Sequence, residues 1–339
     1  GLEIALQGVI FKNRDWNISA SMNFNLNKGN VDQLADNVSG LYSSLWASSA
    51  TFPKSDYVLK EGQPVGLVRG LVSDGFYSTA DFDYNSTTGM YTLKSGIPDM
   101  TAEVFPNYHG IKAGERPAGQ LAYPGMAKFK DADGNGKIDN GDVDVIGNMT
   151  PVHTGGFEIN AAYKNFDLGL LFNWSYGNEI YNANKLASLY GYKESGVYEN
   201  KLSIVKDCYK IYTVENGQLV RLSTPEQLNA ANANATLPLA YNENGIVTTL
   251  GIEDGSFLRL NTLTLGYTLP KSLTVKARLS NVRIYGSIYN LLTLTGYSGL
   301  DPEVNTNTAQ NNQIYPTVGM DWGAYPRARS FVVGASLTF

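Results

Sequence analysis

The feature that most constrains the fold is a set of segments in which apolar and polar residues alternate. From Trp16 to Leu26 the alternation is unbroken, with apolar residues at even positions and serine or asparagine at odd positions. Successive side chains of a β-strand point to opposite faces, so this segment predicts a strand with one apolar and one polar face. Its length matches the roughly 9–11 residues of a tilted strand that crosses a membrane.

Further segments repeat this pattern and bring the number of predicted strands to seven. They lie at residues 2–11, 155–163, 166–174, 257–269, 282–292 and 330–339. In the fourth of these the alternation is clean only from Thr262 onward. The poorer fit of Phe257 to Asn261 indicates a bulge or a rim at that point.

The connections between these predicted strands alternate between short and long. The short ones lie at 12–15, 164–165 and about 270–281, and the long ones at about 27–154, 177–255 and 293–327. Long loops without structure are improbable in a compact soluble domain, whereas short turns on one side and long loops on the other are typical of a bacterial outer-membrane barrel. We therefore predict an all-β fold, a transmembrane antiparallel β-barrel with long extracellular loops.

The side chains on the two faces of the predicted strands support the same interpretation. The polar faces carry Ser, Asn, Thr and Gly but almost no Lys or Glu, which disfavours a soluble β-sandwich whose polar face meets bulk water. On this prediction the Lys164-Asn165 turn faces the periplasm. Aromatic residues near the short turns would form one interfacial girdle: Phe11, Trp16, Tyr163, Phe166, Tyr267 and Phe339.

Composition excludes several other classes of protein. A net charge of -5 without any Lys/Arg run argues against nucleic-acid binding. The lone Cys208 excludes an intrachain disulfide, and His109 and His153 lack partners for a catalytic triad, so we predict no enzymatic activity. No apolar run is long enough for a membrane helix. An odd number of strands does not close a single-chain bacterial barrel. We expect the chain to be the later part of a longer one, since Gly1 directly precedes a strand.

A second motif, DADGNGKIDNGD, occupies residues 131–142. Its oxygen-bearing residues fall at the spacing of a calcium-binding loop, at which Gly136 allows the sharp turn. The predicted ligands are Asp131, Asp133, Asn135, the carbonyl of Lys137, Asp139 and Asp142. We predict a structural calcium site that holds an outer loop in place. The alternative is a polar Asx/Gly turn that holds no metal.

Three blocks of the sequence resemble the SusC/RagA-type TonB-dependent transporters. They are PGMAKFKDADGNGKIDNGDVDVIGNMTPVHTGGFEINAAYKNFDLGLLFNWSYGNEIYN, then FLRLNTLTLGYTLPKSL followed by IYGSIYNLLTLTGYSGLDPEVN, and the opening GLEIALQGVI with WNISASMNFNLNKGNV. The resemblance implies a barrel of about 22 strands that an N-terminal domain plugs. Residues 1–339 would be the C-terminal part and supply its last seven strands, while the plug domain and the earlier strands are absent from this chain.

The resemblance also implies a function. Members of the family import glycans, and in some cases peptides, across the outer membrane by drawing on TonB and the proton-motive force. A SusD-like lipoprotein covers the outer opening, and TonB acts through the N-terminal part. Besides oligosaccharide or peptide substrates, the barrel would contact outer-membrane lipid.

Several loop residues are candidates either for substrate contact or for packing within the loops: Trp46, Tyr108, Arg116, Trp322, Tyr325 and Arg327. Two other functions stay open at this point. One is a calcium-dependent secreted or surface adhesin or enzyme built on a soluble β-domain. The other is a passive porin.

Overall fold

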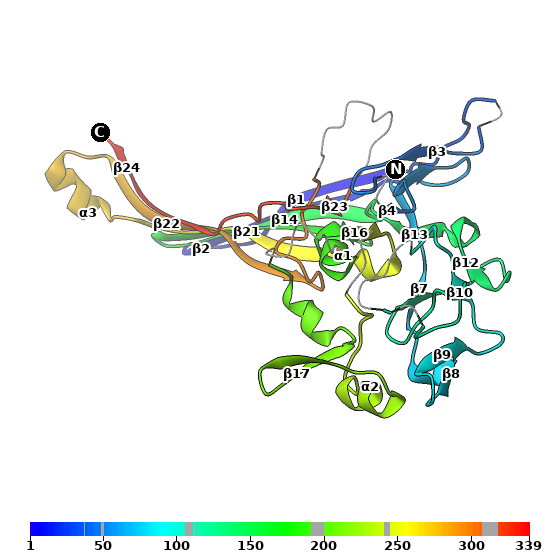
Figure 1. Ribbon diagram of the computed structural model, residues 1–339. Coiled ribbons are helices and arrows are strands. Elements are labelled where there is room, and N and C mark those ends of the chain that lie inside the picture. The colour runs from blue at the N-terminus through cyan, green and yellow to red at the C-terminus, as the bar shows by residue number, and fades with distance from the viewer. Residues whose placement is uncertain are drawn as a thin grey trace.

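The protein consists of a long curved sheet and a body of loops packed at one end of it (Figure 1). The computed structural model describes residues 1–36, 38–48, 51–105, 111–112, 114–190, 200–240, 245–306 and 318–339. His109 and Tyr108 lie outside the described residues.

All seven predicted strands form in one antiparallel sheet, ordered β1-β2-β14-β15-β21-β22-β24. Their bounds are β1 (Leu2–Lys12), β2 (Trp16–Leu26), β14 (His153–Tyr163), β15 (Phe166–Tyr176), β21 (Phe257–Thr268), β22 (Asn281–Thr295) and β24 (Ser330–Thr338). The all-β fold class is thereby confirmed. β1 and β24 are the two edges of this sheet.

The register of the sheet places apolar residues opposite apolar residues. Phe157 pairs with Met22 on one side and with Phe172 on the other. The next row of the sheet, on the opposite face, pairs Glu158 with Ser21 and Leu171. The predicted alternation therefore produces an apolar outer face and a largely polar inner face.

Two bulges change which residues share a face. In β1 the register shifts between Val9 and Phe11, so Phe11 pairs with Ile18 on the outer face. Ile10 is the extra residue and has no partner in β2, whereas strict alternation along the strand would have placed it opposite Ile18. In β21 the shift lies between Leu260 and Thr262, which confirms the bulge expected at Phe257–Asn261.

The two ends of the sheet differ in their connections. At the short-turn end lie the turns at 13–15 and 164–165, the C-terminus, and a connection holding the helix α3 (Lys271–Thr274) and the 3-10 turn η6 (Val275–Ala277) (Figure 1). At the loop end lie loop A (27–152), loop B (177–256) and loop C (296–329). No helix in the described part of the chain is both long and apolar enough to cross a membrane.

Loop A is more regular than the long irregular region that we expected. Its strands are β3 (Leu41–Ser43), β4 (Thr51–Phe52), β5 (Tyr57–Leu59), β6 (Leu67–Gly70), β7 (Ser73–Phe76), β8 (Phe82–Asn85), β9 (Met90–Leu93), β10 (Asp99–Met100), β11 (Ala127–Phe129), β12 (Lys137–Ile138) and β13 (Asp144–Asn148). Two 3-10 turns join them, η1 (Thr79–Asp81) and η2 (Asn140–Asp142). Of these strands, β3, β5, β6 and β13 form a small four-stranded sheet.

Loops B and C add shorter elements to the same body. Loop B contains β16 (Glu179–Asn182), α1 (Ala183–Tyr190), η4 (Ser203–Asp207), β17 (Tyr212–Glu215), β18 (Gln218–Arg221), α2 (Pro225–Ala231), β19 (Gly245–Ile246), η5 (Thr249–Gly251) and β20 (Ile252–Asp254). Loop C contributes β23 (Met320–Asp321), which pairs with β16. The helix α2 begins after Thr224, whose side chain accepts a hydrogen bond from the Gln227 amide, and it ends at Ala231.

The buried core of the protein lies in these loops. We call the three loops packed around it the loop body. Its core includes fully buried side chains from loop A, such as Tyr77 and Met126, and from α1, such as Leu186. By contrast, the outer face of the sheet exposes large apolar side chains, for example Leu6 and Val333.

Candidate functional site

The outer face of the sheet has aromatic side chains at both of its ends. At the short-turn end, Trp16 packs on Tyr163 with ring centroids 4.4 Å apart, and Phe166 packs on Tyr267 at 4.6 Å. The position of these four residues at the short-turn end agrees with the girdle predicted from the sequence. Phe11 and Phe339 also lie at this end and are exposed.

The loop end carries a second aromatic row that the sequence interpretation missed. His153 stacks on Tyr176 at 4.9 Å and lies 5.2 Å from the ring of Phe24. The indole nitrogen of Trp174 donates to Nδ1 of His153 at 3.1 Å. The sequence contained a signal for this row, because these aromatic residues lie at the loop ends of the apolar faces of adjacent strands. His153 is thus not a loop residue but the first residue of β14.

The two aromatic rows are separated by a height that fits a membrane. β14 runs from His153 in one row to Tyr163 in the other. Ten steps along a strand cover about 33 Å, which a tilt of about 40° reduces to a height of about 25 Å. An apolar band of about 25 Å between two aromatic girdles is the outer surface of a transmembrane barrel.

The inner face is polar and contains a trough of about 350 Å³. At its floor Arg283 reaches across Gly266 to Asp167, donating from Nε at 2.9 Å and from its terminal nitrogen. A Cβ on Gly266 would lie 2.4 Å from the Asp167 carboxylate, so only glycine leaves room for this pair. Tyr285 likewise lies over Gly334. Side chains thus lie flat over glycines on this face.

The bulge in β21 determines where Arg259 points. On the short-turn side of the bulge, Leu263 and Leu265 face outward. On the loop side, Leu258 and Leu260 face outward and pair with Leu294 and Leu292 of β22. Arg259 consequently turns to the inner face, where it is 1% exposed.

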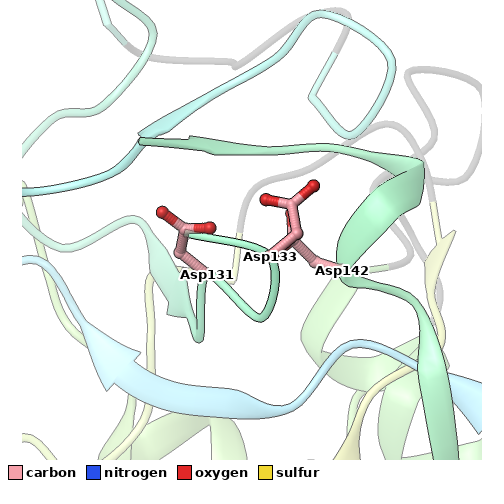
Figure 2. A group of neighbouring side chains, drawn as sticks. All are labelled: Asp131, Asp133 and Asp142. Carbon is pink, nitrogen blue, oxygen red and sulfur yellow. The ribbon is translucent and has the colours of Figure 1, made fainter. Parts of the chain in front are cut away.

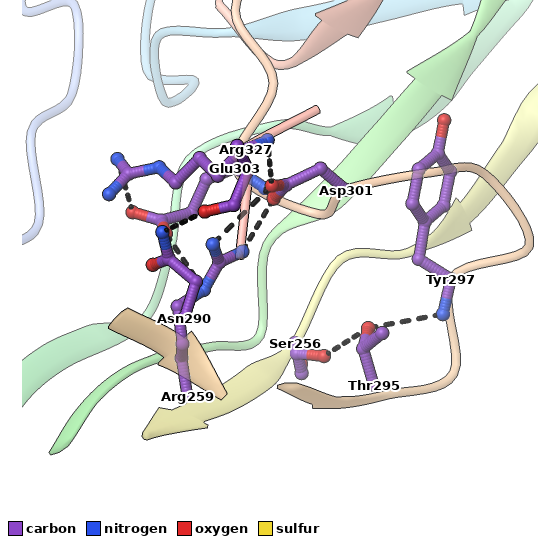
Figure 3. A network of polar contacts seen from close by, with 9 residues as sticks. Ser256, Arg259, Asn290, Thr295, Tyr297, Asp301, Glu303 and Arg327 are labelled. Carbon is purple, nitrogen blue, oxygen red and sulfur yellow. Dashed lines mark hydrogen bonds and ion pairs between the residues drawn. The ribbon is translucent and has the colours of Figure 1, made fainter. Parts of the chain in front are cut away.

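Arg259 is held by two carboxylates of loop C (Figure 3). It donates to Asp301 Oδ1 at 2.5 Å and its Nε lies 3.2 Å from Glu303 Oε2. Asp301 also accepts the Arg327 amide at 3.1 Å, and Glu303 pairs with the Arg327 side chain at 3.1 Å. Burial raises the pKa of Asp301, but the hydrogen bonds from Arg259 and from the amides of Glu303 and Arg327 outweigh burial and hold it below its ordinary value. Both ends of loop C are therefore fixed to the inner face of β21.

The acidic loop at 131–142 lies in loop A, where it follows β11 and contains β12 and η2. The structure brings three of its predicted ligands together: Asp131, Asp133 and Asp142 each offer an oxygen within 4.8 Å of the others (Figure 2). Asp131 is half-buried and Asp133 is exposed, while Asp142 is 1% exposed.

The remaining predicted ligands line the same turn. The Asn135 amide nitrogen lies 3.0 Å from Asp133 and 3.5 Å from Asp139. Lys137 begins β12, and its amide donates to the Asn135 side chain at 2.8 Å. A Cβ at Gly141 would lie 2.6 Å from Asp133 Oδ2, so a larger residue there would have to displace this carboxylate.

Backbone amides already bind the carboxylates of this loop. Asp131 accepts from the amides of Gly136 at 2.8 Å and Gly134 at 2.7 Å, and these hydrogen bonds, led by that from Gly136, lower the pKa of its carboxyl. Asp142 accepts from Ala132 at 2.6 Å and from Asp139 at 2.8 Å. Each carboxylate retains lone pairs, so the site offers only oxygen donors, which suits a hard cation such as calcium.

The candidate residues for substrate contact separate into two groups. Trp46 and Trp322 meet with ring centroids 6.3 Å apart, which joins loop A to loop C. Arg116 donates to the Leu121 carbonyl, so it supports packing within loop A. Tyr325 is 93% exposed, and Arg327 belongs to the cluster around Arg259.

Comparison with known proteins finds similarity to one kind of protein. No family model matches the chain. TonB-dependent receptor P3 of Formosa agariphila is 31% identical over 346 residues, which cover 100% of this chain and 28% of the receptor. SusC of Bacteroides thetaiotaomicron is 28% identical over 214 residues, which cover 62% of this chain and 17% of SusC. The chain therefore spans less than a third of the length of these relatives.

Solved structures give the same fold. The RagAB peptide transporter matches 99% of this chain and 29% of its own, with a TM-score of 0.63 and 22% identity. The RagAB peptide importer in its open-open state matches with a TM-score of 0.57. Sequence similarity along the whole chain, this fold and a two-faced sheet with aromatic ends lead to one conclusion: the chain belongs to the SusC/RagA-type TonB-dependent transporters and represents part of such a protein.

Proposed function

We propose that this chain is the C-terminal barrel portion of an outer-membrane importer that takes up glycans or peptides in a TonB-dependent manner. The observation that carries the proposal is the apolar outer face between two aromatic rows, in a chain similar throughout to TonB-dependent receptors. The open edges at β1 and β24 leave room for further strands of the same barrel. A soluble adhesin or enzyme would have to cover the apolar face in another way.

The proposed mechanism uses binding and movement without covalent chemistry. The loop body lies where substrate arrives, and a SusD-like lipoprotein would close over it. TonB would then act on the N-terminal part of the protein and open a path along the polar inner face. The fixed ends of loop C support this mechanism, since a binding surface that is already ordered loses little conformational entropy when it captures a ligand.

The function can be tested with the full-length protein in its native bacterium. Membrane fractionation should place it in the outer membrane, and extraction should need detergent. Uptake of labelled oligosaccharide and of labelled peptide should be compared in strains with and without TonB and with and without the adjacent lid lipoprotein. TonB-dependent uptake of one class identifies the substrate. Extraction into buffer without detergent would rule out the barrel, and uptake independent of TonB would indicate a passive porin.

We also propose that the acidic loop binds calcium and stiffens loop A. Six predicted ligands share one turn, and three of their carboxylates already converge. Extracellular calcium sites commonly bind in the submillimolar to millimolar range, roughly 10⁻⁴–10⁻³ M. Calorimetry on the full-length protein should detect one such site, Asp133→Asn should weaken it, and Asp144→Asn should not, because Asp144 lies outside the loop and bonds its neighbouring amide. Equal calcium binding by both variants would contradict the assignment.

A further inference from the structure

The trough on the inner face contains a carboxylate that lacks a cationic partner. Its charged side chains are Glu158, Asp167 and Arg283, so two carboxylates face one guanidinium. Arg283 is committed to Asp167 through two hydrogen bonds. Glu158 accepts only the amide of Asn160, at 2.8 Å, among the contacts of the described residues. The trough therefore keeps one uncompensated negative charge, located at Glu158.

An exposed leucine lies directly beside this carboxylate. Leu171 is the cross-strand partner of Glu158 and is 41% exposed. Among the inward-facing residues that line the trough it is the one large aliphatic side chain; the others there are small, hydroxyl, amide or charged. A large apolar side chain next to an unpaired carboxylate on an otherwise polar surface matches the two parts of a lysine or arginine. The aliphatic stem covers the apolar side chain and the charged head meets the carboxylate.

We propose that Glu158 and Leu171 dock a lysine or arginine from a part of the same protein that lies outside this chain. The inference rests on the proposed function, in which this chain is the C-terminal barrel portion and an N-terminal part of the protein controls the path along the inner face. Two observations favour that occupant. The chain matches 28% of the length of TonB-dependent receptor P3, so most of such a protein remains to be placed. The sheet is open at β1 and β24, so added strands would enclose the inner face and the trough with it.

The rigid surroundings of the trough make it a fixed docking point. Glu158 and Leu171 lie on adjacent strands in continuous register, and Thr262 follows on the next strand. Arg283 lies flat between Asp167 and the ring of Tyr285, 5.0 Å from the ring centroid, so it cannot neutralise Glu158 without giving up Asp167. The incoming cation thus meets a carboxylate that no residue of this sheet neutralises.

Photocrosslinking in the full-length transporter tests which molecule occupies the trough. A photoreactive amino acid replaces Leu171, and mass spectrometry identifies the crosslinked partner. We expect an intramolecular crosslink to a peptide from outside residues 1–339, with a lysine or arginine beside the crosslinked atom. A probe in place of Ile284, which is 49% exposed on the outer face, serves as the matched control and should crosslink to lipid instead. A crosslink at position 171 only to added substrate, or to no part of the protein, would overturn the proposal.

Charge variants then test the role of the carboxylate. Glu158→Gln and Glu158→Lys should each lower the yield of the crosslink at position 171, by about tenfold for a lost charge-assisted contact. They should also raise the leak of small solutes through the purified transporter in planar bilayers. Glu3→Gln, which removes a carboxylate from β1 outside the trough, should change neither measurement. Unchanged crosslinking in both Glu158 variants would refute the docking role.

The two proposals fail in different ways. If the crosslink forms but wild-type cells show no TonB-dependent uptake, the importer function is wrong and the docking contact stands. If uptake depends on TonB but the probe at position 171 finds only substrate or solvent, the importer stands and the docking contact is wrong.

Discussion

The sheet and the loop body are built from the same chain but obtain their stability in different ways. The loop body buries its own core, with Tyr77, Leu186 and Met126 fully enclosed. The sheet leaves its apolar side chains exposed on the outer face, where Leu6 is 63% and Val333 is 84% exposed. Water would penalise that face at about 25 cal/mol per Å² of apolar surface, whereas a bilayer would not. The loop body can therefore fold in water, while the sheet requires lipid outside and partner strands at its edges.

The largest effect should come from the cluster that joins the two regions. Arg259→Ala leaves the buried Asp301 without its cation, and removing one partner of a buried ion pair costs about 3–5 kcal/mol. Loop C should detach from β21, which hydrogen exchange on the full-length protein would detect as faster exchange in residues 297–306. Arg283→Ala, which removes a half-exposed pair far from loop C, is the control. Equal protection of loop C in both variants would show that the cluster does not join the regions.

A cavity in the loop body should destabilise it almost as strongly. Leu186 in α1 is fully buried, so Leu186→Ala should lower the free energy of unfolding of the loop body by about 3 kcal/mol. Leu337→Ala is the matched change on the outer face of the sheet, where the side chain is 53% exposed. Urea titration of loop cleavage by protease gives both values. Similar losses for the two variants would mean that the loop body has no independent core.

A charge on the sheet should distinguish its two faces. Val332 and Val333 are neighbours on β24, but Val333 pairs with Gly286 in an outward row and Val332 with Ser287 in an inward row. Val333→Arg should cost about 2 kcal/mol, and up to about 4 near the bilayer midplane. Val332→Arg should cost little. The free energy of refolding into lipid vesicles measures the difference, and equal costs would contradict the assignment of the outer face to lipid.

Acid should affect loop C before it affects the sheet. The pKa of Asp301 is lowered in the folded protein, so its ionised form contributes stability above its unfolded pKa, about 3.9. That contribution is lost as the pH falls from about 4 through the folded pKa. Exchange protection in loop C should decrease over this range, and the decrease should be absent in Asp301→Asn. Acid sensitivity that persists in this variant would assign the effect to another group.

The sequence predicted the sheet well because lipid and lumen impose a strict two-residue period. All seven strands, the short turns and the bulge near Asn261 could be found from that pattern alone. The bulge in β1 could not be found in this way, since one extra residue in the strand leaves no mark in the composition. The loop body was expected to be irregular because its strands are short. Its order comes from contacts between residues far apart in the chain, such as Tyr57 and the Val318 carbonyl, which no local pattern encodes.

The candidate sites differ in the same way. The convergence of Asp131, Asp133 and Asp142 could be predicted because these residues are close in sequence and share one loop. The cluster around Arg259 could not, because Asp301 and Arg327 reach it from the two ends of loop C. The trough beside Glu158 also depends on register, which places Leu171 opposite it.

The bulge in β21 has a consequence for related sequences. Asn261 separates two phases of alternation within one strand, and β22 matches it near Asn290, whose φ of 53° lies in the left-handed region. A relative that lost the residue at 261 would keep its upper leucines outward and its arginine inward, because a regular strand without the extra residue alternates in the same way. A gap of one residue at this point in an alignment therefore leaves both faces of the strand unchanged, whereas a gap of one residue elsewhere in β21 turns over the part of the strand beyond it.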